Sequence, residues 1–232
     1  AGDHVLAMLL PRSGFRSRVV ALARPALESL GDPASGESEL TARLRGLLLG
    51  LVAVLGGDAD ARGRARSVYS AWVADPACVD TELAAAATSV IAATGDESDY
   101  EQMLERAFHG STPQEQLRHL YALAEFDDAE LMVRTCELAL SDRVRTQNAP
   151  FLLRSAIGNR HHGQQAWKFV REHWGEIEER MPRNTIVRMV ETVRGLDHPT
   201  DVADVHGFFS EHPIPQGQRT LEQILERQRV NA

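Results

Sequence analysis

Apolar residues recur along the chain at intervals of three and four positions. One example is the series Leu117, Leu120, Tyr121 and Ala124, which would share one side of a helix. No alternating apolar and polar run of strand length, bounded by turn residues, interrupts this pattern. The pattern therefore predicts an all-α fold.

Helix starts are marked by residues that cap free amide groups. Thr112 to Glu115 combines a capping threonine, a proline in the first turn and a glutamate that can reach back to the cap. Ser98 to Glu101 predicts a second capping box, and Asp127 to Glu130 predicts an acidic cap. Further starts are expected near Ser38, Asp58, Thr81, Thr146, Gly163, Asn184, Pro199 and Gly217.

Starts spaced by roughly 14 to 22 residues are typical of short antiparallel helix pairs. Stacked pairs form helical solenoids, so we expect a right-handed superhelix of HEAT- or armadillo-like pairs in one domain, residues 1–232. Residues 31–38 resemble a linker but are too short to separate domains. Gly46 and Gly50 favour close helix packing over dimerisation in lipid.

Composition narrows the class of partner. The longest apolar run, Leu47 to Leu55, falls well short of the roughly 20 residues that cross a bilayer. The first ten residues lack the basic start of a signal peptide, which favours a cytoplasmic protein. The formal charge of −8 disfavours nucleic acid and anionic membranes as partners.

Cysteine and histidine are the first candidates for chemical groups. Cys78 and Cys136 are predicted to be buried thiols in a reducing compartment, with a functional thiol as the alternative. The nine histidines include no His-Glu-x-x-His motif. His161 and His162 are interpreted as a solvated loop, with metal or substrate contact as the alternative, and His173 as structural.

No nucleophile elbow, P-loop or dinucleotide-binding motif is present, although a pair of catalytic carboxylates stays undetectable in sequence. An aromatic segment is predicted to be core rather than a ligand cage; it comprises Trp167, Phe169, Val170, Trp174 and Ile177. Four arginines cluster at Arg143, Arg145, Arg154 and Arg160. Solvation and internal ion pairs are favoured for them, with a peptide carboxylate as the alternative ligand.

From Thr112 onward the sequence resembles the C-terminal helical domain of zinc aminopeptidases of the aminopeptidase N, puromycin-sensitive and endoplasmic-reticulum type. The resemblance rests on Arg145-Thr146-Gln147-Asn148, the turn at 159–163, the segment 166–174, and Val205 to Phe209. It continues to the final helix, which ends at Asn231, and is fainter but colinear upstream, at residues 44–58 and 75–76.

The resemblance implies a parent enzyme that removes N-terminal amino acids from peptides with zinc. The zinc is held by His-Glu-x-x-His and a downstream glutamate in its catalytic domain. This chain contains neither that motif nor the exopeptidase motif Gly-x-Met-Glu-Asn. No catalytic residue, metal ligand or cofactor is therefore assigned to it, and it is expected to be inactive alone, as part of a longer helical domain.

In the family this domain forms a bowl that closes over the catalytic domain and encloses the peptide. The expected partners are therefore the catalytic domain of the same polypeptide and the peptide substrate, with Arg154 and Arg160 as candidate peptide-binding residues. Alternatives are a free-standing helical-repeat scaffold that binds a protein partner, and an unrecognised enzyme. The apolar segment from Val5 to Leu10 predicts self-association of the chain.

Overall fold

The computed structural model describes residues 12–232, and these residues are helical, with short connections and no strand among them. The predicted all-α class is confirmed. The segment from Val5 to Leu10 lies outside the described residues. Superhelical winding and a single domain stay predictions, because the contacts divide the chain into two compact units, residues 1–122 and 123–232.

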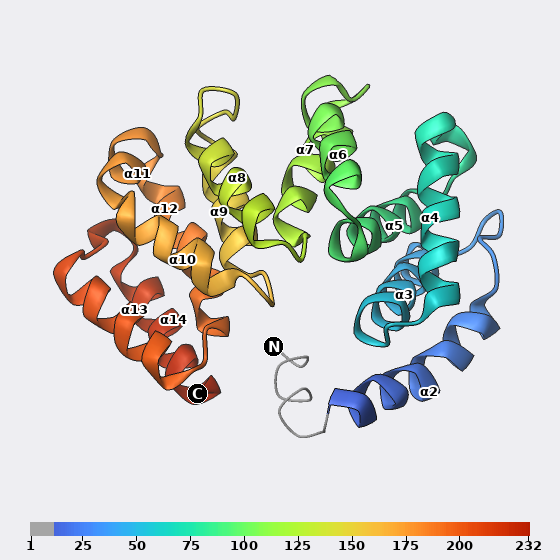
Figure 1. Cartoon of the computed structure of the whole chain (residues 1–232), viewed down its shortest axis with the longest axis horizontal. Helices are drawn as coiled ribbons and strands as arrows, with labels where there is room; N and C mark the ends of the chain where they lie inside the picture. Colours follow the sequence, from blue (N-terminus) through green and yellow to red (C-terminus); the bar gives the residue numbers. More distant parts are fainter. Residues whose placement is uncertain (1–11) are drawn as a thin grey trace. The chain divides into compact units, whose positions relative to one another are not determined.

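The first unit consists of helices joined by short turns (Figure 1). Its α-helices are α2 (Arg12–Leu30), α3 (Glu39–Gly50), α4 (Ala59–Ala74), α5 (Thr81–Thr94), α6 (Glu97–His109) and α7 (Pro113–Ala122). A π-helical turn, η1 (Leu51–Leu55), continues α3, and a 3₁₀ turn, η2 (Pro76–Cys78), follows α4. Within this unit α5 packs against both α3 and α4, and α6 against α7.

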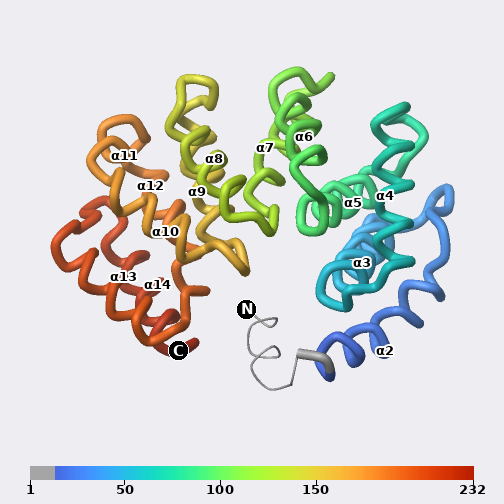
Figure 2. The backbone as a smooth tube through the Cα atoms, viewed as in Figure 1, coloured from blue at the N-terminus to red at the C-terminus, as the bar shows by residue number. Residues whose placement is uncertain are grey.

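The second unit also consists of short helices, which Figure 2 traces from yellow-green to red. They are η3 (Leu123–Glu125), α8 (Ala129–Leu140), α9 (Ala149–Ile157), α10 (Gly163–Glu172), α11 (Trp174–Arg180), α12 (Arg183–Met189), η4 (Val190–Gly195), α13 (Pro199–Glu211), η5 (Pro215–Gly217) and α14 (Gln218–Asn231). Here α9 packs against α8, α10, α12 and η4, which makes it the central helix.

Several predicted helix starts are confirmed by side chains that cap amide groups. Thr112 Oγ1 accepts from the Glu115 amide at 3.1 Å, and Asp128 Oδ1 accepts from the Leu131 amide at 2.9 Å. Ser38 caps α3 through the amide of Thr41. An uncapped amide at a helix end loses a hydrogen bond, so these residues set where helices begin.

Two predicted starts were displaced. The capping box of α6 is formed by Asp96 and Asp99, so the helix begins at Glu97, and the predicted box at Ser98 is wrong. Asp96 and Ser98 each have an acidic residue three positions later, so two alternative boxes overlap and sequence cannot rank them. The helix expected near Thr146 begins at Ala149, because the Arg145 carbonyl accepts from the amides of both Asn148 and Ala149 in a preceding turn.

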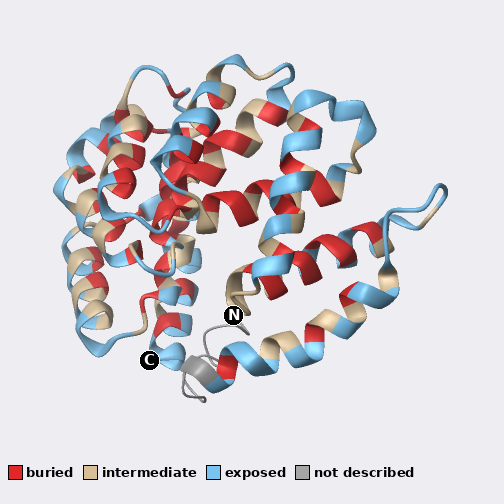
Figure 3. Cartoon of the chain, turned by 45° about the vertical axis from the view of Figure 1, so that its right-hand side comes forward, coloured by how far each residue is buried: buried red, intermediate tan, exposed pale blue. Residues whose placement is uncertain are grey.

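Each helix buries one side and exposes another, as the alternation of red and blue along the ribbons shows (Figure 3). In the first unit, α3 approaches α5 closely at Gly46, where a Cβ atom would lie 3.1 Å from the Glu82 carbonyl oxygen. This confirms close packing as the role of Gly46. A Cβ atom on Gly50 would meet nothing within 4 Å, so Gly50 takes no part in that contact.

An aromatic core fills part of the second unit. Trp167 and Trp174 are each 3% exposed and meet Phe208 edge-to-face, at centroid distances of 5.3 and 5.2 Å. Val170 and Ile177 are fully buried, which confirms the predicted core. Phe169 is an exception, because it is only half-buried and stacks on His173.

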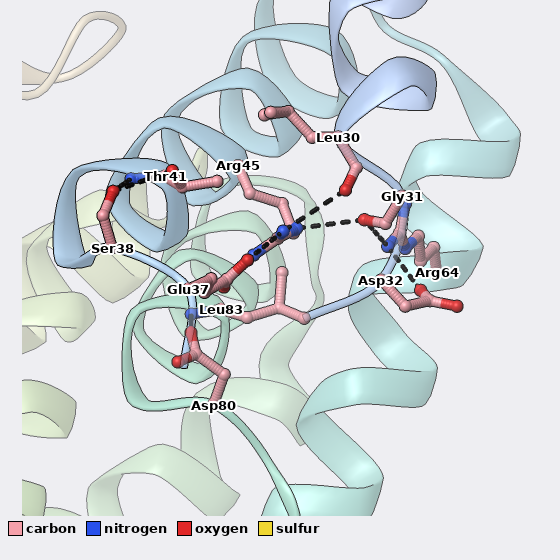
Figure 4. A network of polar contacts seen from close by, with 10 residues as sticks. All are labelled: Leu30, Gly31, Asp32, Glu37, Ser38, Thr41, Arg45, Arg64, Asp80 and Leu83. Atoms are coloured by element: carbon pink, nitrogen blue, oxygen red, sulfur yellow. Dashed lines mark hydrogen bonds and ion pairs between the residues drawn. The ribbon is translucent and has the colours of Figure 1, made fainter. Parts of the chain in front are cut away.

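A buried arginine closes the loop between α2 and α3 (Figure 4). Arg45, 1% exposed, donates to both carboxylate oxygens of Glu37, at 2.6 and 2.7 Å. It also donates to the carbonyl oxygens of Gly31 at 3.0 Å and Leu30 at 3.3 Å. The side chain therefore holds both ends of residues 31–37 against α3.

The predicted burial of the cysteines is confirmed for Cys136 but not for Cys78. Cys136 is buried, and burial raises the pKa of its thiol to about 12. Cys78 is exposed in the short turn after α4, where its thiol donates to the Asp75 carbonyl at 3.0 Å, so its predicted burial was wrong. Among residues 12–232, no helix is long and apolar enough to cross a membrane.

Candidate peptide-contacting site

Arg154 lies on the last turn of α9, at the edge of the second unit's core. The opposite side of α9 buries Leu152, Leu153 and Ala156 completely, which fixes the helix in place. The Arg154 side chain is 38% exposed, and its guanidinium forms an ion pair with Glu191 of η4, Nη2 to Oε2, at 2.9 Å. Half-exposed, this pair contributes modestly to stability but occupies one edge of the guanidinium.

The backbone of Arg154 also takes part in hydrogen bonds. Its carbonyl oxygen accepts from the hydroxyl of Thr192 at 2.7 Å and from the Gly158 amide at 3.1 Å. Glu191 lies 3.6 Å from Arg194 as well, so its carboxylate is shared between two guanidinium groups. An internal ion pair, the alternative favoured for these arginines, is what the structure shows for Arg154.

Arg160 lies in the turn between α9 and α10 and is exposed. Asn159 builds this turn: its amide nitrogen donates to the Ala124 and Phe126 carbonyls, at 2.9 and 3.1 Å. Its Oδ1 accepts from the amides of His161 and His162, both at 2.9 Å. Arg160 itself has no hydrogen bond or ion pair with the other residues of 12–232, so its donors are available.

His161 and His162 face one carboxylate, that of Asp127. His162 Nε2 lies 3.2 Å from Asp127 Oδ1, and His161 Nε2 lies 3.7 Å from Oδ2. The side chain of His161 is 59% exposed, as expected for a solvated loop, whereas that of His162 is 20% exposed. The two imidazoles therefore already face a carboxylate, whereas the guanidinium of Arg160 has no partner within residues 12–232 and could bind a carboxylate or a peptide carbonyl.

The described residues do not fit a zinc ion. Zinc requires three or four converging histidine, cysteine or carboxylate donors, and no group of three in residues 12–232 is placed to supply them. In the histidine turn, both Nε2 atoms point at oxygens of the same carboxylate and the ring centroids are 6.4 Å apart. No chemical step through a metal is therefore derived for this chain.

His173 confirms its structural interpretation. Its Nδ1 lies 2.9 Å from the Phe169 carbonyl oxygen. A carbonyl can only accept, so Nδ1 carries the proton of this hydrogen bond. The ring then closes the end of α10.

A second polar cluster, in the first unit, was not found from sequence. His119 is fully buried; its Nδ1 donates to the Glu115 carbonyl at 2.9 Å, and its Nε2 lies 3.1 Å from the Tyr69 hydroxyl. Because Nδ1 holds the proton, Tyr69 donates to Nε2. The Trp72 ring stacks on the His119 imidazole, with ring centroids 5.4 Å apart. The Arg118 guanidinium lies over the Trp72 ring.

Burial decides the titration of this cluster. Desolvation lowers the pKa of His119, and the nearby Arg106 lowers it further, although the hydrogen bond to the Glu115 carbonyl raises it. Desolvation also raises the pKa of Tyr69 to about 12. Both groups are therefore neutral near pH 7. A neutral, fully enclosed pair holds α7 against α4 and offers no access for a substrate.

Asp204 is a further residue that sequence analysis missed. Its carboxylate accepts from Trp167 Nε1 at 2.8 Å and pairs with Arg171 at 2.8 Å. It links α13 to α10, and the only sequence signal was a tryptophan that needed a partner for its N–H. Asp204 therefore serves the core of the second unit.

The comparison with protein families gives this geometry a context. The family model described as "ERAP1-like C-terminal domain" matches residues 3–230. The chain belongs to this family. The resemblance to the C-terminal domain of the aminopeptidase family is thereby confirmed.

Curated relatives of this chain agree with the assignment to the ERAP1-like C-terminal domain family. Aminopeptidase M1 of Arabidopsis thaliana is 31% identical over 229 residues, which cover 95% of this chain and 26% of the relative. Aminopeptidase M1-A of Oryza sativa subsp. japonica is 29% identical, with 92% and 25% covered. Glutamyl aminopeptidase of Mus musculus is 25% identical, with 90% and 22% covered. The chain thus spans about a quarter of the length of these relatives.

Proposed function

We propose that this chain is the non-catalytic C-terminal lid and chamber domain of an aminopeptidase that removes N-terminal amino acids from peptides. The observation that carries the proposal is the match of the ERAP1-like C-terminal domain to residues 3–230, joined by relatives that are named aminopeptidases. In this proposal the rest of the polypeptide supplies the catalytic domain and its zinc ion. The chain itself contains neither the His-Glu-x-x-His nor the Gly-x-Met-Glu-Asn motif.

The proposed role is exclusion and alignment. A helical wall around a hydrolytic site limits the length of peptide admitted and holds the peptide relative to the reacting groups. We propose that the short helices of this chain wind as a right-handed superhelix to form such a wall. The regular succession of short helices with one buried side each supports this arrangement.

Arg160 is the foremost candidate for contact with the peptide. Its guanidinium is exposed and unpaired within residues 12–232, on a turn that Asn159 fixes through four hydrogen bonds. Arg154 is second, because it would have to share its ion pair with Glu191. An arginine can bind a terminal carboxylate through two parallel hydrogen bonds, which would align the far end of a peptide.

We place the protein in the cytoplasm, a proposal that agrees with its two unpaired cysteines. The proposed partners are the catalytic domain of the same polypeptide and the peptide substrate. The net charge of −8 disfavours nucleic acid and anionic membranes as further partners.

The test compares this 232-residue chain with the complete polypeptide that its gene encodes. Both are assayed with a fluorogenic aminoacyl substrate, with and without added zinc. The complete polypeptide is expected to release the fluorophore, and to lose activity when a chelator removes its metal. The 232-residue chain is expected to be inactive under every condition.

Two results would contradict the proposal. Zinc-dependent turnover by the 232-residue chain would make it an enzyme in its own right. An inactive complete polypeptide without either zinc-peptidase motif would favour the alternative of a helical-repeat scaffold that binds a protein partner.

A further inference from the structure

Helix α3 carries apolar residues on two opposite sides. One side is buried against its neighbours through Ala42, Gly46 and Leu49. The opposite side exposes Leu40 to 79%, Leu44 to 47% and Leu47 to 60% of their surface. These three leucines are called the α3 leucine stripe below. A helical side that carries a row of large apolar residues normally packs against another element, and this side of α3 is exposed.

The spacing of the stripe is that of a helix-packing seam. Its leucines lie four and then three residues apart, and Leu51, half-buried, follows after four more. Alternation of three and four is the pattern by which one helix packs along another. The charged residues exposed on α3, Glu39 and Arg43, lie beside the stripe rather than within it.

The stripe cannot turn inward to bury itself. Gly46 holds α3 so close to α5 that a Cβ atom would lie only 3.1 Å from the Glu82 carbonyl oxygen. One position earlier, Arg45 is anchored to Glu37 and to two carbonyl oxygens of the α2–α3 loop. Rotation of α3 would break both contacts, so the leucines are presented as a fixed surface.

The area of the stripe identifies the kind of occupant. Three leucines with these exposures offer roughly 300 Å² of apolar surface, against the about 800 Å² that each partner buries in a stable specific complex. A second copy, or a protein met by diffusion, would therefore bind weakly. A helix on the same polypeptide needs far less area, because the tether raises its effective concentration to the millimolar range.

We propose that the α3 leucine stripe is the docking face for an amphipathic helix of the polypeptide that precedes residue 1 in the longer protein. The inference rests on the proposed function, in which this chain is the C-terminal part of that protein. The relatives have about three quarters of their length outside the matched region, which is ample to supply such a helix. The docked helix presents apolar side chains at three- and four-residue spacing to the stripe.

Cysteine labelling tests the proposal. Leu44→Cys is introduced into a Cys78→Ser background, since Cys78 is the exposed native thiol and Cys136 is buried. The rate of reaction with a maleimide is measured in the 232-residue chain and in the complete polypeptide. We expect at least a tenfold slower reaction in the complete polypeptide, with Leu47→Cys as a second position should Leu44→Cys fold poorly.

Glu39→Cys is the matched control, because residue 39 is exposed on the same helix but off the stripe. Its labelling rate is expected to differ less than threefold between the two proteins. Equal rates at position 44 in both proteins would overturn the proposal. Slow labelling in the 232-residue chain that speeds up on dilution would assign the stripe to a second copy, and slow labelling at every concentration to residues 1–11; either result overturns it.

Peptidase activity of the complete polypeptide is read separately. If position 44 is protected but no aminoacyl substrate is cleaved, the proposed function fails while the docking face stands. If the substrate is cleaved and position 44 reacts equally in both proteins, the function stands and the docking face is wrong. The two ideas are therefore tested independently in the same preparations.

Discussion

The two units hold their loops in different ways. In the first, a charged side chain does so: the buried guanidinium of Arg45 binds the Glu37 carboxylate and two backbone carbonyls of the loop that follows α2. In the second, a neutral side chain does so: Asn159 binds two backbone amides of its own turn and two backbone carbonyls at Ala124 and Phe126. The same task is thus performed by an ion pair in one unit and an amide in the other.

The difference has a consequence for acid stability. A carboxylate that binds a guanidinium in the fold prefers to stay ionised, and hydrogen bonds from Arg45 and Arg66 lower the pKa values of Glu37 and Asp99. Both carboxylates lie in the first unit. Amide hydrogen bonds do not titrate. We therefore expect the first unit to be the more acid-sensitive of the two.

The largest expected effect comes from Arg45→Met. The variant removes the donors to the carbonyls of Leu30 and Gly31 and a well-packed buried side chain, at a cost of about 3 kcal/mol in the free energy of unfolding. Hydrogen exchange followed by mass spectrometry should show the loss in residues 12–122 and not in residues 123–232.

Arg64→Met is the matched control, because Arg64 binds Asp32 of the same loop at 2.9 Å but Asp32 is 92% exposed. A surface pair of this kind contributes less than about 1 kcal/mol. Equal destabilisation by the two variants would mean that burial of Arg45 is not what holds the loop.

The next effect is expected from Asn159→Ala, which breaks the corresponding contact in the second unit. Loss of its hydrogen bonds should reduce the free energy of unfolding by about 2 kcal/mol. Urea unfolding monitored by exchange in residues 123–232 measures it. As a control, Asn231→Ala removes one exposed hydrogen bond, to the Arg194 carbonyl, and should lower the free energy of unfolding far less. A larger loss in Asn231→Ala would mean that Asn159 does not contribute more to stability than an exposed asparagine.

Lowering the pH should sharpen the contrast further. The pKa of His119 is lowered in the fold. Below pH 6.5, the ordinary pKa of histidine, the unfolded chain therefore binds a proton at this position more readily than the folded chain does. Stability should fall as the pH is lowered through this range. The depressed pKa values of Glu37 and Asp99 add a second loss, once the pH falls below their ordinary values of 4.5 and 3.8.

Thermal unfolding between pH 7 and pH 5 measures the first of these losses. His119→Phe keeps a ring against Trp72 without a titrating group, so its unfolding temperature should be lower at pH 7 but should change less with pH. An identical pH dependence in the variant would rule out His119 as the cause.

The smallest effect concerns the candidate site. In the complete polypeptide, Arg160→Gln should raise KM for peptides with a free terminal carboxylate about two- to fivefold, the worth of one exposed ion pair. The kcat value, and KM for amidated peptides, should not change. A change in kcat with no change in KM would contradict a contact limited to the peptide terminus.

Much of the fold was predictable because its signals are local. Caps such as Thr112 and Asp128 act within three residues of their own position, so the sequence around them is enough to place a helix start. Where two capping boxes overlap, as at Asp96–Asp99 and Ser98–Glu101, the choice depends on packing: Asp99 pairs with Arg66, 33 residues away.

The polar clusters were not predictable, because their contacts join residues that only the fold brings together. Nothing beside Arg45 indicates that it will be buried, because its partners lie on the far side of a loop. His119 and Tyr69 are 50 residues apart and meet only once α4 and α7 are packed. In the candidate site, sequence proximity put Arg154 and Arg160 together, but only the fold showed that Arg154 is paired and Arg160 is free within residues 12–232.

Arg45 also defines where the chain can change in length. Its side chain forms hydrogen bonds with residues 30, 31 and 37. The residues between them, from Asp32 to Gly36, are exposed and make no hydrogen bond with Arg45. Extra residues inserted between Pro33 and Gly36 would enlarge the loop without moving its ends, at a small cost in chain entropy. This loop is therefore the natural position for an inserted epitope or fluorescent reporter in the first unit.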